Sequence, residues 1–166
     1  MRVIVENGVF CDVYLAASLN VWQHRTMEDM AEIEQLKPAA RNAWKRLKDE
    51  FPLWATHLGI RDEELEFAVP APSGSAAGHL VAFTNGNDLW IRFSPPYMCY
   101  SADSLNEMVW LIHQLTADKI MFKVTMKGAE WVETTLTNPQ EKCEAIPGHS
   151  VHLVSWSGRY DKLLEA

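Results

Sequence analysis

The sequence predicts an α+β fold in which an antiparallel sheet of about five to six strands packs against helices, in the order helices-βββ-α-βββ. Three observations predict this class. Apolar residues recur at helical spacing as far as Gly59, and from Glu64 onward they mostly alternate with polar residues. The strand-like segments are joined by loops of hairpin length, which favour antiparallel pairing. One further helical stripe, at 105–115, divides the strands into two groups.

Length and composition favour a single domain over 1–166, with a helical N-terminal part at about 12–59 and a sheet-forming part at about 64–157. The net charge of −7 argues against nucleic-acid or anionic-membrane binding, and no apolar run reaches the ~20 residues of a spanning helix. The first residues lack the uninterrupted apolar segment of a signal peptide. Three cysteines fit a reducing compartment, so we expect a cytoplasmic protein.

The first residues allow two interpretations. Asn7-Gly8 lies between β-branched and aromatic residues and is typical of a type I′ hairpin turn. A helix from Asp12 through Trp22 is the competing interpretation.

Two helices are predicted next. Thr26 can cap the first, whose apolar residues recur every three positions as far as Ile33, and Pro38 ends it or starts the next. The second helix carries one apolar stripe, formed by Ala40, Trp44, Leu47 and Phe51. A further helical turn can follow at Pro52 and close at Gly59 in a left-handed cap.

Alternation predicts three strands in the middle of the chain. The first covers 64–69, and the next two, 79–84 and 89–94, form a hairpin. The segment 70–78 is rich in proline, glycine and small residues, and we expect a mobile loop there. In the third strand, the core side is expected to carry Leu89, Ile91 and Phe93, and the other side Trp90 and Arg92.

The helix after this hairpin has two candidate N-caps. Ser104 with Glu107 forms a capping box, whereas Ser101 would allow a hydrophobic staple between Tyr100 and Leu105. We favour Ser104. The predicted buried stripe of this helix is Leu105, Met108, Ile112 and Leu115.

The register of the next hairpin can be argued from side chains. A two-residue loop would place Val124 opposite Glu133, which sets an apolar residue against a charge. A three-residue loop at 127–129 pairs Val124 with Val132 and Lys123 with Glu133. Because a slip of one residue turns every side chain to the other face, we predict the second register.

A last strand at 151–157 completes the order, which resembles the topology of secretion chaperones. In that architecture a helix, three strands, a helix and further strands form a dimer that holds an unfolded client. The resemblance is topological: it implies a protein-binding homodimer and assigns no residues.

Motifs of the common enzyme classes are missing from the sequence. It contains no G-x-x-x-x-G-K-[ST], G-x-G-x-x-G, H-E-x-x-H, G-x-S-x-G or C-x-x-C pattern. This argues against the nucleotide-binding, zincin and hydrolase classes. An enzyme whose catalytic residues are dispersed along the chain would show none of these motifs. We predict no cofactor.

Cys99 is the candidate nucleophile. A thiol close to a helix N-terminus can have a lowered pKa, and His79 or His113 could act as its base. The competing interpretation, which we favour, is a rigid loop in which Tyr97 and Tyr100 pack over the core.

A second candidate site is the sheet face that points away from the core. If the strands are neighbours, indole rings and charges of both signs share one surface, where Arg92 could bind a carboxylate and Glu133 a donor. The alternatives are a protein interface and a solvated face with pairs such as Lys123–Glu133. The residues expected on this face are Trp90, Arg92, Lys123, Thr125, Trp131, Glu133 and Thr135.

Two further clusters are weaker. Cys143, His149 and His152 have the chemistry of zinc ligands but lack a fourth, so we predict no metal site. A run of cations without an acid could dock an acidic partner, or could form a solvated helix face. This run is Lys37, Arg41, Lys45, Arg46 and Lys48.

The leading hypothesis is a non-catalytic, cytosolic protein-binding module, chaperone-like or immunity-like, that uses the aromatic sheet surface or a helix interface and forms a homodimer. The alternative is a small-molecule-binding protein or an enzyme with a pocket near 90–101. The candidate binding residues are Trp90, Arg92, Tyr97, Cys99, Tyr100, Trp131 and Glu133.

Overall fold

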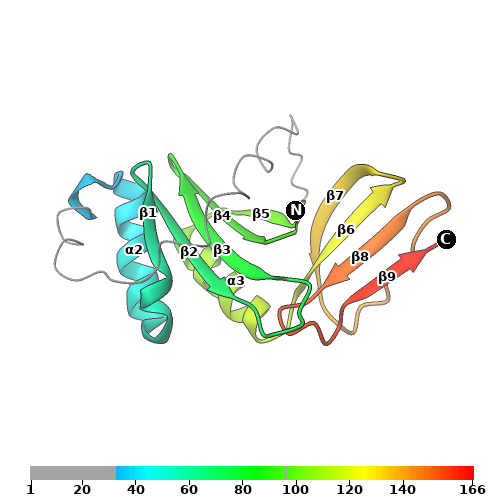
Figure 1. Cartoon of the computed structure of the whole chain (residues 1–166). Helices are drawn as coiled ribbons and strands as arrows, with labels where there is room; N and C mark the ends of the chain where they lie inside the picture. Colours follow the sequence, from blue (N-terminus) through cyan, green and yellow to red (C-terminus); the bar gives the residue numbers. More distant parts are fainter. Residues whose placement is uncertain (1–32, 96) are drawn as a thin grey trace.

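The structure is a computed structural model that describes residues 33–95 and 97–166 (Figure 1). The predicted hairpin at Asn7-Gly8, the competing helix over 12–22 and the cap at Thr26 lie outside the described residues. Helices and antiparallel strands confirm the α+β class. In chain order the elements are α2 (Pro38–Glu50), η2 (Pro52–His57), β1 (Leu58–Arg61), β2 (Glu64–Pro70), β3 (His79–Asn85), β4 (Asp88–Phe93), β5 (Cys99–Ala102), α3 (Leu105–Thr116), β6 (Met121–Lys127), β7 (Glu130–Thr137), β8 (Ser150–Val154) and β9 (Lys162–Glu165).

The strands of the described residues form two sheets where the sequence predicts one. A five-stranded sheet has the order β1-β2-β3-β4-β5, and a four-stranded sheet has the order β7-β6-β8-β9. The two sheets lie side by side, with the four-stranded sheet at the C-terminal end (Figure 1). The strands that escaped sequence analysis, β1, β5 and β9, have four residues each, which is too short for a clear alternation of apolar and polar side chains.

The helical stripe of α2 is confirmed. Pro38 begins the helix, and the side chains predicted for its apolar stripe are all buried. Gly59 was expected to cap a helical turn in the left-handed region, and this is wrong. It lies in β1 opposite Glu66, because η2 ends at His57 and the chain continues as a strand.

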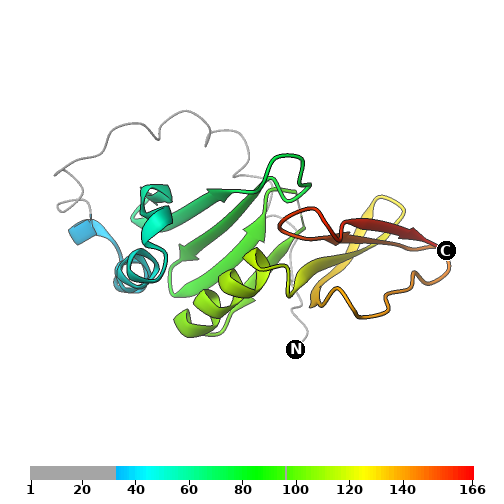
Figure 2. The same cartoon turned by 90° about the horizontal axis from the view of Figure 1, so that it is seen from below.

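The alternation predicted for β2 and β4 is confirmed. Residues on one face are buried against α2 and α3, which also contact each other (Figure 2). This core face carries Leu65, Phe67, Val69, Leu80, Ala82, Ile91 and Phe93. The opposite face, which we call the outer face, carries Glu66, Ala68, Val81, Phe83, Trp90, Arg92 and Cys99.

The cap of α3 is Ser104, as predicted. Its hydroxyl accepts a hydrogen bond from the Glu107 N–H at 3.2 Å, and the Glu107 carboxylate accepts one from the Asp103 N–H at 2.7 Å. The competing candidate, Ser101, lies in β5. The buried residues of α3 are Met108, Val109, Leu111, Ile112 and Leu115.

The predicted register of the β6–β7 hairpin is wrong. The loop has two residues, with Lys127 opposite Glu130, and the register shifts next to Met126. This β-bulge leaves Val132 as the extra residue, 45% exposed, and sets Val124 opposite Thr134. A two-residue turn and a bulge together therefore avoid placing Val124 against Glu133.

One core joins the two sheets. The ring of Phe93, from β4, meets Phe122 of β6 at 4.9 Å and Trp156 at 6.2 Å between centroids. Phe122 and Val124 are buried in the same cluster as the α2 and α3 stripes. A second, smaller cluster on the other face of the four-stranded sheet contains Met121, Val151 and Leu153.

Glu64 connects three parts of the fold. Its carboxylate accepts hydrogen bonds from the Thr84 hydroxyl at 2.6 Å and the Gly86 N–H at 2.9 Å, and it pairs with the ammonium group of Lys37. Thr84 in turn accepts from the Leu65 N–H at 3.0 Å. Partial burial raises the pKa of Glu64, but these bonds outweigh that effect, and the pKa lies below its ordinary value of 4.5.

This network gives a prediction for stability. A lowered folded-state pKa means that ionised Glu64 stabilises the fold above the unfolded pKa and loses that effect as pH falls through the folded value. We expect Glu64→Gln to lower the free energy of unfolding by about 1–2 kcal/mol at neutral pH. Urea unfolding followed by tryptophan fluorescence measures the loss, which should shrink at a pH well below 4.5.

Glu130→Gln, at an exposed position of β7, is the matched control and should change stability little. A deficit in Glu64→Gln that is equal at neutral and at acid pH would contradict the role of the carboxylate charge.

Candidate functional site

The outer face of the five-stranded sheet gathers aromatic and charged side chains. In the cross-strand register Phe83 lies between Glu66 and Trp90, and Val81 lies between Ala68 and Arg92. Residues directly opposite each other on neighbouring strands share a face and contact each other. The hydrogen-bonded meander of β2, β3 and β4 therefore holds this group of side chains in a fixed array.

Arg92 is held by stacking. The rings of Phe83 and Trp90 stack with centroids 6.5 Å apart and an angle of 14° between their planes. The guanidinium carbon of Arg92 lies 6.0 Å from the centroid of Phe83, within range of a cation–π contact. Within the described part of the chain, Arg92 forms no ion pair. Its guanidinium is thus oriented and has donors available for an anionic group.

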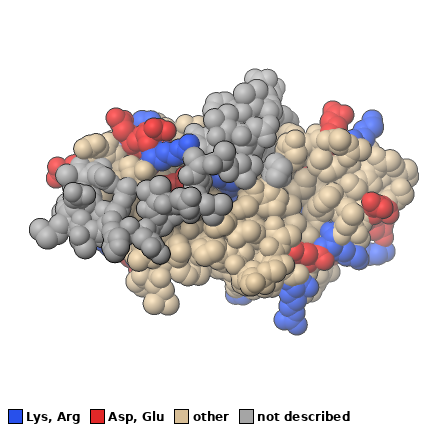
Figure 3. Space-filling model, in the orientation of Figure 1, with Lys and Arg blue, Asp and Glu red and all other residues tan. Residues whose placement is uncertain are grey.

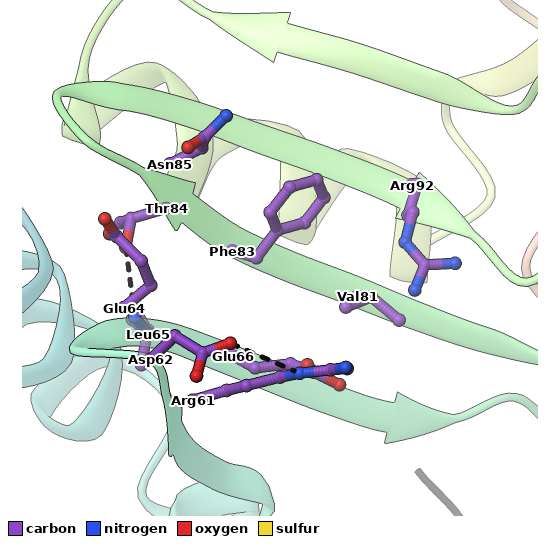
Figure 4. A pocket seen from close by; sticks show the side chains of 10 residues that line it. All are labelled: Arg61, Asp62, Glu64, Leu65, Glu66, Val81, Phe83, Thr84, Asn85 and Arg92. Atoms are coloured by element: carbon purple, nitrogen blue, oxygen red, sulfur yellow. Dashed lines mark hydrogen bonds and ion pairs between the residues drawn. The ribbon is translucent and has the colours of Figure 1, made fainter. Parts of the chain in front are cut away.

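A hollow lies beside this array (Figure 4). In this view Val81 lies between the guanidinium groups of Arg61, from β1, and Arg92, from β4. Arg61 lies 3.9 Å from the carboxylate of Asp62. The lining residues are Arg61, Asp62, Glu64, Leu65, Glu66, Val81, Phe83, Thr84, Asn85 and Arg92.

Three of the predicted binding residues come together on the outer face. Trp90 and Arg92 lie on β4, and Cys99 on β5 is directly opposite Arg92. The predicted position of Cys99 beside a helix N-terminus is wrong, since Cys99 is the first residue of β5 and the rest of that strand lies between it and α3. The suggested bases have other contacts: His79 lies against the Ser94 hydroxyl at 3.3 Å, and His113 pairs with Glu50 at 2.9 Å.

Tyr97 and Trp131 form a separate pair where the two sheets meet. Their rings stack at 6.0 Å with an interplanar angle of 14°. The Thr134 hydroxyl accepts from the indole N–H of Trp131 at 3.0 Å and donates to the carbonyl oxygen of Tyr97. Tyr97 has a φ of 69°, a strained value for a tyrosine, and this interlock holds it there. The pair therefore joins β7 to the segment before β5.

Tyr100 and Glu133 lie away from the outer face. Tyr100 is opposite Ile91 on the core face, where partial burial, helped by the charges of Glu107 and Asp103, raises its pKa above the ordinary 10.0. Glu133 is opposite Thr125 in the four-stranded sheet, on the face of the smaller core cluster.

The single surface that we predicted is therefore divided. Strand β4 does not neighbour β6 or β7, and the bulge at Val132 turns Trp131 and Glu133 to opposite faces of β7. The predicted Lys123–Glu133 pair is also wrong, because Lys123 faces Thr135.

The candidate zinc ligands have other contacts. His149 Nδ1 lies 3.2 Å from the carbonyl oxygen of Pro147, His152 lies 3.5 Å from the Ser150 hydroxyl, and Cys143 lies 3.8 Å from the Thr137 hydroxyl. Over 33–95 and 97–166 no group of three or more His, Cys, Asp or Glu side chains is placed to hold a metal ion.

Most of the cationic run on α2 is engaged. Lys37 pairs with Glu64, Arg41 donates to the Leu36 carbonyl at 3.1 Å, and Arg46 pairs with Glu50 at 3.1 Å. Lys45 and Lys48 are exposed. Lys37 and Arg41 therefore connect the start of α2 to Glu64 and to the chain before the helix, whereas Arg46 pairs within α2.

Sequence analysis missed several members of the outer face. Val81 and Phe83 could have been found, because the two-residue turn Gly86-Asn87 fixes the register that sets them beside Arg92 and Trp90. Arg61 could not, since β1 shows no alternation that predicts a strand.

Comparisons with protein-family models, with curated proteins and with solved structures found no match to this chain. None of the helices that the structure describes has both the length and the apolar character needed to cross a membrane. The proposal for its function therefore depends on the site geometry.

The interlock at Tyr97 gives a second prediction. Thr134→Val keeps the side-chain shape but leaves the indole N–H of Trp131 and the Tyr97 carbonyl without their shared hydroxyl. We expect a loss of about 1–3 kcal/mol in the free energy of unfolding, measured by chemical denaturation. Thr135→Val, one residue along β7, is the control. Equal stability of Thr134→Val and the native chain would show that the interlock contributes nothing.

Proposed function

We propose that this chain is a non-catalytic protein-binding module whose recognition surface is the outer face of the five-stranded sheet. The observation that carries the proposal is Arg92, stacked over Phe83 beside Trp90, with no counter-ion in the described residues. Tryptophan and arginine are the residues most enriched at energetic centres of protein interfaces. An antiparallel sheet covered by helices on one face leaves its other face for such contacts.

The chemistry of this face suggests the partner. Arg92 supplies a planar fork of donors that matches a carboxylate, and Val81, Phe83 and Trp90 supply apolar contact area around it. The partner is therefore a protein segment that presents an aspartate or glutamate next to apolar side chains. Chaperone-like or immunity-like binding, in which one protein masks a surface of another, fits such a site.

The test is selection from a displayed library of random peptides. We expect the native chain to enrich peptides with an acidic residue beside an aromatic or aliphatic one, because only this combination satisfies both Arg92 and its apolar surroundings. Arg92→Gln removes the charge and should weaken binding of the selected peptides at least about ten-fold, as measured by calorimetry.

Lys45→Gln is the matched control, since it removes the same charge from an exposed position of α2. If both variants lost the same affinity for the selected peptides, the effect would come from net charge, and the proposal would be contradicted. If no peptide is selected, but the native chain retains a small metabolite that Arg92→Gln releases, the small-ligand alternative is favoured.

We also propose a cytoplasmic location and a homodimer. Edge strand β9 supports the dimer: it pairs with β8 on one side, and Leu163 on it is 53% exposed. A free strand edge with an exposed leucine is a template for pairing with a second copy. The cytoplasm suits a chain with an odd number of cysteines.

Light scattering tests the assembly. We expect a dimer for the native chain and a shift toward monomer for Leu163→Lys, because the charge opposes burial of the β9 edge. Leu53→Lys makes the same change at a leucine of η2 that is 92% exposed, and should leave the dimer intact. A monomeric native chain, or a Leu163→Lys variant that remains dimeric, would contradict this interface.

A further inference from the structure

A second hollow lies far from the outer face in the fold, on the four-stranded sheet. Its floor is apolar, formed by side chains of β6, β8 and β9, and its rim comes from the loop 138–149 and the turn before β9. Its volume is about 360 Å³, within the range of sites for small molecules. The lining residues are Met121, Pro139, Glu141, Lys142, Cys143, Leu153, Arg159, Tyr160, Asp161, Lys162 and Leu164.

The charges at the rim leave two cations available. Lys142 pairs with Glu144 at 2.6 Å. Neither Arg159 nor Lys162 forms an ion pair with any residue that the structure describes. Charged side chains of both signs gather over this end of the molecule in Figure 3.

The acids of the rim are already bound by neutral donors. Asp161 accepts from the Ser155 N–H at 2.7 Å and from its hydroxyl at 3.0 Å. Glu141 accepts from the Thr137 hydroxyl at 2.7 Å. Both carboxylates accept hydrogen bonds from neutral groups, and neither forms an ion pair with Arg159 or Lys162. These two cations are therefore the groups best placed to bind an anion.

The turn that carries Arg159 is fixed in place. Ser155 is fully buried, and its hydroxyl also accepts from the Tyr160 N–H at 3.1 Å. Gly158 has a φ of 77° and packs closely on Ser75, where a Cβ would lie 3.2 Å from the Ser75 Cα. The guanidinium of Arg159 lies over the Tyr160 ring at 5.4 Å. A preorganised cation loses little conformational freedom when it binds a ligand.

From these observations we infer that this hollow is a binding site for a small organic acid, with the carboxylate on Arg159 and Lys162 and the apolar body on Met121, Leu153 and Leu164. Lys162 lies directly opposite Leu153 in the β8–β9 register, so the charge and the apolar floor are adjacent. An uncharged ligand would leave both cations without a partner, and a fully polar one would leave the floor uncovered. The loop 138–149, a long connection without regular structure, fits a binding role.

Octanoate is the probe, and octan-1-ol is its uncharged counterpart. On the full chain, calorimetry should show octanoate binding at least about ten-fold tighter than octan-1-ol, because only the acid meets the cations. Arg159→Met and Lys162→Met keep an unbranched stem of similar reach and should each weaken octanoate about ten-fold, with octan-1-ol unchanged. Lys127→Met, at the exposed end of β6, is the control and should bind octanoate as the native chain does.

Cys143 provides a readout at the site itself. It lines the hollow, so bound octanoate should slow its alkylation by iodoacetamide, whereas alkylation of Cys99 on the five-stranded sheet should not change. Peptide mapping by mass spectrometry follows both thiols in one sample. The inference is overturned if octanoate does not bind, if octan-1-ol binds equally well, if Lys127→Met is weakened as much as Arg159→Met, or if Cys143 is not protected.

Discussion

The packing of α2 and α3 on one face of the five-stranded sheet is the constraint on which the rest of the structure depends. Phe67 lies at its centre: it is fully buried, and its ring lies 5.9 Å from that of Phe51 at the end of α2. Because successive side chains of a strand point to opposite faces, burial of Phe67, Ile91 and Phe93 on the core face turns Phe83, Trp90 and Arg92 outward. The proposed recognition surface is thus a consequence of how the core is filled.

Two polar connections keep the sheets and helices in register with this core. Glu64 ties the segment before α2 to the β3–β4 hairpin, and it does so close to the hollow that Arg92 lines. At the other edge, Thr134 links Trp131 to the backbone of Tyr97 and so joins the second sheet to the first. Both connections use a single side chain to satisfy several partners, so each is costly to disrupt.

The sequence predicts those helices and strands in which apolar residues recur at a regular spacing over several residues. The stripe of α2, the Ser104 cap and the facing of β2, β3 and β4 were accessible because each involves a long pattern or a specific local bond. The bulge at Val132 could not be predicted, because a strand with one extra residue shows the same alternation as a strand paired one position out of register. The division into two sheets was also hidden, because strand neighbours depend on contacts distant in sequence. Trp90 and Arg92 were placed on one face because they are two residues apart in one strand. Cys99 was expected in a loop and lies in β5 opposite Arg92, and Trp131 and Glu133 were assigned to a surface that they do not share.

The central claim is that the outer face of the five-stranded sheet binds an acidic protein segment. Its most direct test is a chemical-shift map, by solution NMR, of the full chain titrated with a peptide that the native chain selects. We expect the largest shifts at the backbone amides of Val81, Phe83, Trp90 and Arg92 and at the indole N–H of Trp90. Shifts confined to α2, α3 or the four-stranded sheet would contradict the account.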